Sequence, residues 1–236
     1  MDKVVYITGG TKGIGLGIAK ALVEAGCKVA VSGRNEQTAK EAAASIGDES
    51  QVIGFASDVR TLADEEKAVA KIKEHFGRLD VAIANAGVGI YANIQELSAD
   101  DWQKMIDTNL SGVFHTIKAG VNELVNNKGY FITVASLAGT NFFAGGSGYN
   151  ASKFGVVGFT QAVMLDLRTQ GVKTTTIMPG SVSSYFNERV PDAEKDVWKI
   201  QPEDLGQIVV DLLKMHPRTL PSKIEVRPLQ TADMLK

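Results

Sequence analysis

The sequence is poor in cysteine and proline, with one cysteine, Cys27, and 6 prolines among 236 residues. A single cysteine excludes an internal disulfide and suits a reducing compartment. No run of about 18 apolar residues occurs, so we expect no membrane-spanning helix. The first ten residues lead directly into a strand-like pattern, which is unlike a signal peptide. We therefore expect a cytoplasmic protein without a membrane partner.

The sequence also lacks an excess of basic residues. It has 25 Lys and Arg against 27 Asp and Glu, scattered along the chain, with a formal net charge of −2. This balance argues against a nucleic-acid partner. His75, His115 and His216 form no ligand-like cluster, so we predict no metal site. With 44% hydrophobic residues, no repeat and no linker-like segment, residues 1–236 are predicted to form a single domain.

Short runs rich in valine and isoleucine alternate with longer amphipathic stretches, which is the pattern of βαβ units. We predict strands at 4–7, 28–32, 51–56, 79–84, 130–135, 173–178 and 223–226. Helices are predicted at 16–25, 35–45, 61–76, 99–126, 149–169 and 202–215, the fourth bent or split near Gly112 or Gly120. The fold class is therefore α/β, a Rossmann-like doubly wound parallel sheet of about seven strands with helices on both faces.

A glycine-rich loop, Thr8-Gly9-Gly10-Thr11-Lys12-Gly13-Ile14-Gly15, follows the first strand. Glycines there let the backbone turn sharply and approach a pyrophosphate at the start of the next helix. The spacing is Gly-x-x-x-Gly-x-Gly and not GxGxxG, and no Lys-Ser/Thr follows, which argues against a triphosphate-binding loop. The loop predicts a dinucleotide site, with a plain structural turn as the alternative.

The end of the second strand bears on the choice of dinucleotide. An acidic residue there would bind a ribose hydroxyl, whereas a basic residue accommodates a 2′-phosphate. The sequence reads Val31-Ser32-Gly33-Arg34, with no acid. Arg34 and Lys12 therefore favour NADP(H) over NAD(H). The alternative is that both are solvated surface cations.

Tyr149 and Lys153 lie four residues apart in a predicted helix and so share one face. A tyrosine hydroxyl titrates near pH ~10, and a neighbouring ammonium is expected to lower that pKa toward neutrality. A phenol with such a pKa can serve as the acid in carbonyl reduction. The pair alone is a weak signal, since short motifs occur often by chance.

Further motifs follow the strands in a fixed order. They are Asp58-Val59, Asn85-Ala86-Gly87, Asn109, Ser136 and Pro179-Gly180, together with the glycine loop and the Tyr149/Lys153 pair. In this order the chain resembles the short-chain dehydrogenase/reductase family, in its compact one-domain form, nearly from end to end. The resemblance implies a catalytic tetrad of Asn109, Ser136, Tyr149 and Lys153.

In that tetrad Ser136 would hold the substrate carbonyl and Tyr149 would transfer the proton. Lys153 would lower the Tyr149 pKa and bind the nicotinamide ribose, and Asn109 would hold a water in a proton relay. The resemblance also implies cofactor contacts from Gly9, Thr11, Lys12, Gly13, Ile14, Gly15, Arg34, Asp58, Val59, Asn85, Ala86, Gly87, Tyr149, Lys153, Pro179, Gly180, Val182 and Ser184. Two positions depart from the family pattern: Ala84 stands where a second asparagine is frequent, and Ser184 where threonine is usual.

The segment 183–200 is expected to cover the substrate, with Tyr185, Phe186 and Trp198 as apolar walls or as packing anchors. The resemblance implies an NADP(H)-dependent carbonyl reductase or alcohol dehydrogenase acting on a small carbonyl compound or secondary alcohol. The alternatives are a dinucleotide-binding sensor or interaction protein on the same fold, and a nucleotide-sugar epimerase or dehydratase. Family members commonly pair their long helices, so a homodimer or homotetramer is expected.

Overall fold

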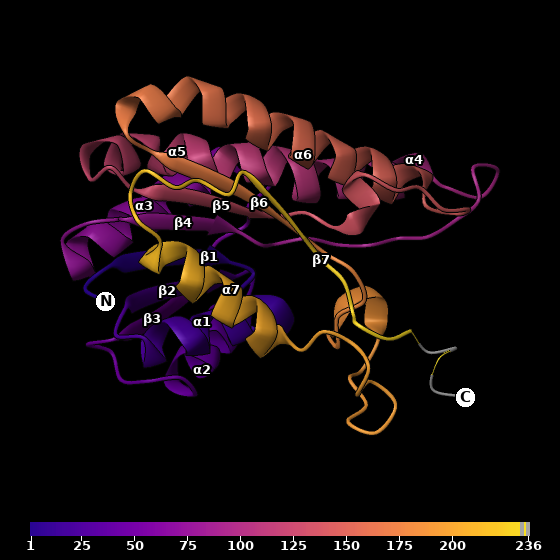
Figure 1. Ribbon diagram of the computed structural model, residues 1–236, viewed down its shortest axis with the longest axis horizontal. Coiled ribbons are helices and arrows are strands. Elements are labelled where there is room, and N and C mark those ends of the chain that lie inside the picture. Colours follow the sequence, from indigo (N-terminus) through magenta and orange to yellow (C-terminus); the bar gives the residue numbers. More distant parts are fainter. Residues whose placement is uncertain (232–233, 235–236) are drawn as a thin grey trace.

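The computed structural model describes residues 1–231 and 234, and its centre is a parallel sheet of seven strands (Figure 1). The spatial order is β3-β2-β1-β4-β5-β6-β7, and every neighbouring pair is parallel. The strands are β1 (Val4–Thr8), β2 (Lys28–Gly33), β3 (Val52–Ala56), β4 (Val81–Ala84), β5 (Tyr130–Val134), β6 (Lys173–Pro179) and β7 (Lys223–Val226). The predicted doubly wound sheet is confirmed.

Helices cover both faces of the sheet (Figure 1). They are α1 (Gly13–Glu24), α2 (Glu36–Ala44), α3 (Leu62–Phe76), α4 (Ala99–Ile106), α5 (Gly112–Asn126), α6 (Ser147–Leu167) and α7 (Pro202–Lys214). One buried cluster joins α1, α2 and α7 to the sheet, and a second joins α3, α5 and α6 to the opposite face. Among the described residues no helix is both long and apolar enough to cross a bilayer.

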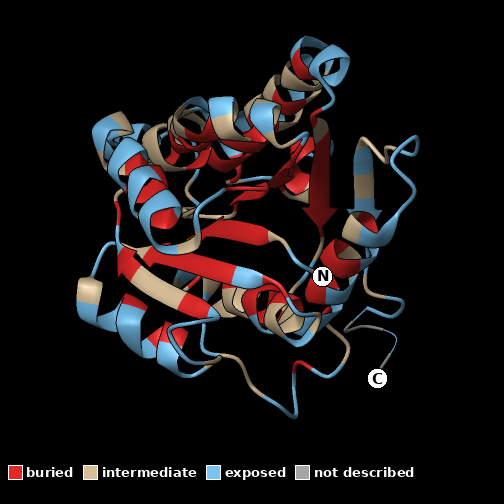
Figure 2. Cartoon of the chain, turned by 90° about the vertical axis from the view of Figure 1, so that its left-hand side faces the viewer, coloured by how far each residue is buried: buried red, intermediate tan, exposed pale blue. Residues whose placement is uncertain are grey.

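The central strands, β1, β4 and β5, are buried on both faces because each face meets a helical layer. In β1, Val5 and Ile7 belong to the cluster under α1 and α7, whereas Val4 and Tyr6 belong to the cluster under α3 and α5. Figure 2 shows the resulting concentration of buried residues along the central strands. Burial on two sides, and not on one, explains why these strands read as continuous hydrophobic runs.

The stretch predicted as one helix at 99–126 is divided, near the expected position. A π-helical turn, Asp107–Ser111, separates α4 from α5. Gly112 begins α5 directly after this turn, and a Cβ on Gly112 would lie 2.7 Å from Val59 Cγ2. Single π-turns within helices are frequent at functional sites, and this one contains Asn109.

The order of the strands reverses between β1 and β4, which are neighbours in the sheet although β2 and β3 come between them in sequence. In open parallel sheets, ligands bind beyond the carboxyl ends of the strands at such a reversal. The glycine loop after β1 and the Asn85-Ala86-Gly87 segment after β4 both lie there. The fold therefore brings these motifs to one crevice.

Candidate functional site

The glycine loop has a backbone that side chains would disrupt. Gly9 and Gly13 have φ of +64° and +55°, in the left-handed region that favours glycine. A Cβ on Gly9 would lie 2.8 Å from Ala86 Cα, and one on Gly15 would lie 2.5 Å from Asn85 Nδ2. The loop after β1 is thus packed directly on the segment after β4.

Asn85 fixes this contact with hydrogen bonds. Its side-chain amide donates to the carbonyls of Thr8 (2.9 Å) and Gly9 (3.0 Å). The Thr8 hydroxyl in turn accepts from the backbone amides of Asn85 (3.1 Å) and Ala86 (3.2 Å). Asn85 therefore holds the glycine loop in place without the second asparagine that is frequent in the family, since residue 84 is alanine.

The α1 helix starts without a side-chain cap. Its N-cap is Lys12, whose side chain makes no capping hydrogen bond. The first amides of a helix have no intrahelical acceptor, and the helix dipole favours an anion beside them. A loop with open backbone amides, shaped by Gly9 and Gly13, fits a dinucleotide pyrophosphate.

The ends of β2 and β3 lie beside the glycine loop. Gly33 packs so closely on Thr11 that a Cβ there would lie 2.7 Å from Thr11 Cγ2. Asp58, after β3, is paired with Arg60, whose Nε lies 3.0 Å from both carboxylate oxygens. The Arg60 hydrogen bond, and to a smaller extent the charge of Arg34, hold the pKa of Asp58 below its ordinary value. Sequence reasoning did not single out Arg60, which sits two residues after a predicted site residue.

Val59 is buried and is held from α5. The Nδ1 atom of His115 lies 2.8 Å from the Val59 carbonyl oxygen. His115 was considered in the sequence only as a metal ligand, whereas the structure gives it this positioning contact. Only the packing of α5 against the loop after β3 reveals it.

Asn109 lies in the π-helical turn and is fully buried. Its amide nitrogen donates to the carbonyl of Val88 (2.8 Å) and to the hydroxyl of Ser152 (3.0 Å), and its oxygen accepts from the amide of Val88 (2.8 Å). Both amide protons are therefore used by the protein. These bonds join the segment after β4 to α6. The water-holding role of Asn109 stays a prediction.

Tyr149 and Lys153 share one face of α6, as predicted. The Lys153 ammonium lies 5.8 Å from the centre of the Tyr149 ring and donates to the carbonyl of Val134 at 3.1 Å. A Cβ on Gly87 would lie 3.6 Å from Lys153 Nζ and 3.3 Å from Asn109 Oδ1. Burial lowers the pKa of Lys153 to about 8. The sequence motif after β4 therefore meets the lysine and the asparagine directly.

The expected lowering of the Tyr149 pKa by Lys153 is not found in this structure. Burial raises the pKa of Tyr149 well above its ordinary value of 10.0; a hydrogen bond with Ser136 opposes this, and Tyr91 adds to it. Tyr149 is only 6% exposed. The free-energy cost of ionising a buried phenol is therefore larger than the stabilisation that the Ser136 hydroxyl gives to the ionised form. At neutral pH the side chain therefore carries its proton.

Ser136 reaches the site from the end of β5. Its hydroxyl accepts from the amide of Ala138 at 3.1 Å and caps the short 3₁₀ turn Leu137–Gly139. The same hydroxyl lies close enough to Tyr149 to act against the rise of its pKa. Ser136, Tyr149, Lys153 and Asn109 are thus brought together from three elements, as the resemblance implied.

The segment after β6 returns across the crevice. Pro179 ends β6, Gly180 donates to the carbonyl of Val226 (2.8 Å), and Val182 pairs with Ile200 in a parallel bridge. A Cβ on Gly13 would lie 3.4 Å from Ser184 Cβ. The covering segment, residues 183–200, therefore starts over the glycine loop.

Two aromatic residues of the covering segment lie on the crevice and one does not. Lys12 Nζ is 5.6 Å from the centre of the Tyr185 ring, and the Phe186 ring is 5.6 Å from that of Tyr149. Trp198 instead lines a separate depression with Val226 and Pro228. Phe186 and Tyr185 therefore are the members of the trio that reach the predicted site.

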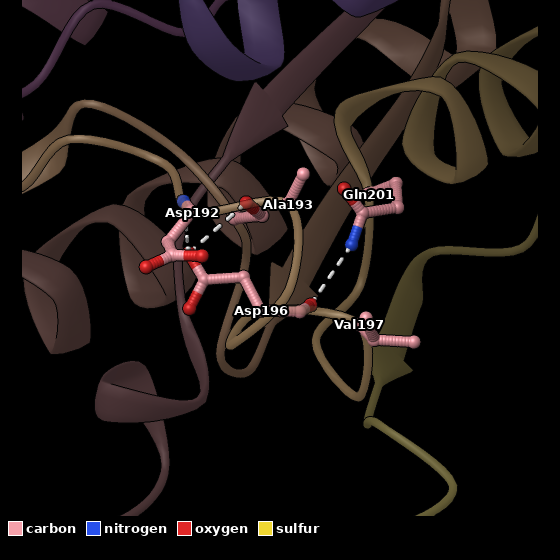
Figure 3. Close-up of a pocket in the computed structure, with 6 residues that line it drawn as sticks. Asp192, Ala193, Asp196, Val197 and Gln201 are labelled. Carbon is pink, nitrogen blue, oxygen red and sulfur yellow. Dashed lines mark hydrogen bonds between the residues drawn. The ribbon is translucent and has the colours of Figure 1, made fainter.

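A cavity of about 290 Å³ lies within the covering segment itself (Figure 3). Ser183, Asp192, Asp196 and Gln201 are among its lining residues, and the Asp196 carboxylate accepts from the Ser183 hydroxyl at 3.2 Å. None of the tetrad residues lines it. Within the described part of the chain, no group of three or more His, Cys, Asp or Glu residues is arranged to hold a metal ion.

Comparison with known proteins agrees with this arrangement. The short chain dehydrogenase family model matches residues 3–195. An uncharacterised oxidoreductase of Staphylococcus saprophyticus is 32% identical over 231 residues, covering 97% of this chain and 98% of the relative. One from Staphylococcus aureus strain MRSA252 is 30% identical over 229 residues, with coverage of 97% and 98%.

Solved structures share the whole fold. An alcohol dehydrogenase from Thermococcus sibiricus, complexed with 5-hydroxy-NADP, has a TM-score of 0.89 and 28% identity, with 98% of each chain covered. A serine dehydrogenase complexed with NADP⁺ has a TM-score of 0.86 and 27% identity over 94% of each chain. Given this agreement over nearly its whole length, the chain belongs to the short-chain dehydrogenase/reductase family of oxidoreductases, which bind nicotinamide dinucleotides.

Proposed function

We propose that the protein is an NADP(H)-dependent carbonyl reductase or alcohol dehydrogenase in which Tyr149 is the general acid and base. The observation that carries this proposal is the meeting of Ser136, Tyr149, Lys153 and Asn109 beside the glycine loop. A sensor needs the loop but has no use for a buried phenol matched with a serine and a lysine. The four side chains together therefore favour an enzyme.

The residues of the crevice fit the dinucleotide. The glycine loop, from Gly9 to Gly15, would hold the pyrophosphate on open amides, and Asp58 and Val59 would border the adenine. At the other end, the segment from Asn85 to Gly87, the Tyr149/Lys153 pair and the stretch from Pro179 to Ser184 would surround the nicotinamide and its ribose. When bound, the cofactor supplies or accepts hydride.

The chain's own residues handle the proton. Ser136 donates a hydrogen bond to the substrate oxygen and so stabilises the negative charge that develops there. Tyr149, protonated because burial raises its pKa, donates its proton to that oxygen during reduction and accepts it during oxidation. Lys153, with its pKa near 8, supplies positive charge at neutral pH beside the phenolate that Tyr149 then becomes.

Two exposed cations support the preference for NADP(H). Lys12 precedes α1 and Arg34 follows β2, and the segment after β2 carries no acid to receive a 2′-hydroxyl. The guanidinium of Arg34 suits bidentate binding of a phosphate. Both cations lie at the position where family members distinguish the two dinucleotides.

The catalytic assignment is tested by Tyr149→Phe, which removes only the hydroxyl. We expect turnover with ketones and diones to fall by about 10² to 10⁴-fold, the usual size of a general-acid contribution, with the affinity for NADPH nearly unchanged. Tyr130→Phe is the control, because the hydroxyl of Tyr130 is also buried but binds Thr175 within the sheet. A fully active Tyr149→Phe variant would contradict the assignment.

The cofactor preference is tested separately by measuring kcat/KM with NADPH and with NADH. We expect a preference for NADPH, and a loss of that preference of about 10-fold or more in Arg34→Ala. Lys20→Ala, which removes an exposed cation from the far part of α1, is the control. A wild-type preference for NADH would refute the role given to Arg34 and Lys12.

The same proposal includes a homodimer or homotetramer. The outer faces of α5 and α6 expose large apolar side chains, with Phe114 and Phe154 each 43% exposed and Leu165 55% exposed. Exposed apolar side chains of this size on adjoining helices are typical of association surfaces. A cytoplasmic location stays a prediction from the composition of the sequence.

A further inference from the structure

Two aromatic rings, those of Tyr91 and Phe186, pack against Tyr149. The ring of Tyr91 lies 5.5 Å from that of Tyr149 in an edge-to-face arrangement, and the ring of Phe186 lies 5.6 Å from it. Phe143 packs edge to face on Tyr91 at 5.4 Å. We infer that the substrate carbonyl carries a planar aromatic group, which binds beside Tyr149 in the place that Phe186 takes in this structure. This inference rests on the proposed reductase function.

Access to Tyr149 requires one of these rings to move. Only 6% of Tyr149 is exposed, and the rings of Tyr91 and Phe186 both pack against it. Tyr91 and Phe143 come from two loops that are tied together, because the amide of Ala92 donates to the carbonyl of Gly145 at 2.9 Å. Phe186, in contrast, belongs to the covering segment, which the Val182–Ile200 bridge anchors at its ends.

The space that Phe186 fills has the shape of a flat ring. A Cβ on Gly89 would lie 2.4 Å from Phe186 Cε1 and 2.6 Å from Cζ, so the ring rests directly against the Gly89 backbone. The ring of Tyr149 lies beside it, with 5.6 Å between the ring centres. Once Phe186 leaves, the space between the Gly89 backbone and Tyr149 has the size of the ring that filled it, which suits a planar group.

The chemistry of the walls is also apolar. Val88, Ile90 and Leu97 pack with Tyr149 and Phe186 in one cluster. The polar groups identified at this wall are the Tyr91 hydroxyl and Arg189, whose charge acts on Tyr91. A sugar would need several hydrogen-bonding partners here, whereas an aryl group gains from edge-to-face contacts. The cluster therefore favours an aryl ketone or aryl dione over a hydroxylated substrate.

The test compares two vicinal diones with NADPH, 1-phenyl-1,2-propanedione and 2,3-pentanedione, with dihydroxyacetone as a hydroxylated third. We expect kcat/KM to favour the phenyl compound by about 10-fold or more. Equal or greater activity with 2,3-pentanedione or dihydroxyacetone would overturn the inference and leave the reductase function standing. Absence of turnover with all carbonyl compounds tried, despite NADPH binding, would instead refute the proposed function.

Three variants locate the aromatic site. Phe186→Ala should lower KM for the phenyl dione about 3-fold or more, because the chain's own ring no longer competes. Gly89→Ala should reduce the phenyl preference about 10-fold, because its methyl group enters the slot. Phe142→Ala is the control: this neighbouring ring is 86% exposed, and the preference should not change. Loss of the phenyl preference in Phe186→Ala would show that the Phe186 ring contacts the bound substrate. It would overturn the inference that the phenyl group takes the place of this ring.

Discussion

Replacing Glu65 with leucine is expected to destabilise the protein, and replacing it with glutamine is expected to remove the pH dependence of stability that its carboxyl group contributes. Glu65 lies on α3 and is fully buried. One carboxylate oxygen accepts from the hydroxyls of Tyr6 (2.8 Å) and Ser57 (2.7 Å), and the other accepts from the hydroxyl of Thr116 (3.0 Å). These contacts join β1, the loop after β3 and α5 under the adenine end of the crevice.

The magnitude follows from counting donors and acceptors in this group. The Tyr6 hydroxyl also lies 3.0 Å from that of Ser32, and the single proton of the Thr116 hydroxyl is shared between Glu65 and the carbonyl of Gly112, which is 2.9 Å away. Without the carboxylate, the hydroxyls of Tyr6, Ser32 and Ser57 have only one another, so one donor at the end of the chain loses its acceptor. A buried donor without a partner costs about 1–3 kcal/mol, so Glu65→Leu should be about 2 kcal/mol less stable than the wild type at low pH, where a protonated Glu65 satisfies every hydroxyl.

Glutamine is the matched variant because its shape is the same, it does not ionise, and it keeps a partner for each of the three hydroxyls, although one of its two amide protons has no acceptor there. Its oxygen accepts from Tyr6 and Ser57, and its amide donates to the Thr116 hydroxyl, which keeps the Gly112 carbonyl as its own acceptor. Burial also raises the pKa of Glu65 above its ordinary value of 4.5. Its contribution to stability is thus fully present below that value and is lost as the pH rises through the folded-state pKa.

The assay is equilibrium unfolding in urea of the wild type and both variants, at several pH values from about 4 to 8. We expect equal m-values for the three proteins and a lower urea midpoint for Glu65→Leu. The unfolding free energy of the wild type should decrease relative to that of Glu65→Gln as the pH increases. Equal stability of Glu65→Leu and the wild type at pH 4 would refute the reasoning, because the hydroxyls would then find other partners. A pH-independent difference between the wild type and Glu65→Gln would refute the raised pKa.

Three further predictions concern single positions. Because burial lowers the pKa of Lys153 to about 8, the unfolded chain binds this proton between pH 8 and about 10 while the folded chain does not. The unfolding free energy of the wild type should therefore rise relative to Lys153→Met by up to about 1.4 kcal/mol per pH unit; a constant difference would contradict this. Thr174→Val should stabilise by about 1 kcal/mol, since Thr174 Oγ1 is buried without a partner, whereas Thr175→Val should destabilise because Thr175 binds Tyr130 and Pro221. Thermal melts compare the two, and a loss of stability in Thr174→Val would show that its hydroxyl is satisfied. Phe154→Glu should reduce the sedimentation coefficient from that of a dimer or tetramer to that of a monomer; a wild type that sediments as a monomer would exclude the assembly.

Local patterns were enough for the elements and for the motifs within them. Seven strands were predicted within a few residues of their bounds, because each is a short apolar run between turns. The helix predicted at 16–25 begins at Gly13, so the end of the glycine loop, Gly13 to Gly15, lies within the bounds of α1. Periodicity could not detect this, because glycine carries no side chain to mark a face.

Contacts between distant segments were beyond these patterns. The His115 contact with Val59 joins residues 56 positions apart, and the Glu65 contact with Tyr6 joins residues 59 apart. Neither His115 nor Glu65 directly follows a strand, which is where this fold class is expected to place its ligand-binding residues. The π-turn at Asn109 was predicted only as a bend near Gly112, and the close packing of Gly112 on Val59 joins segments that are distant in the sequence.

The sequence by itself determined the doubly wound sheet, the family and the pairing of Tyr149 with Lys153 on one helix turn, because periodicity and spacing act within a segment. The tertiary structure decided the state of that pair. Phe186 and Tyr91, remote from Tyr149 in sequence, cover it, and this burial raises the pKa of Tyr149 while the burial of Lys153 lowers its own. The solvation of a charged group depends on all the segments that surround it, so a local sequence pattern cannot predict these pKa shifts.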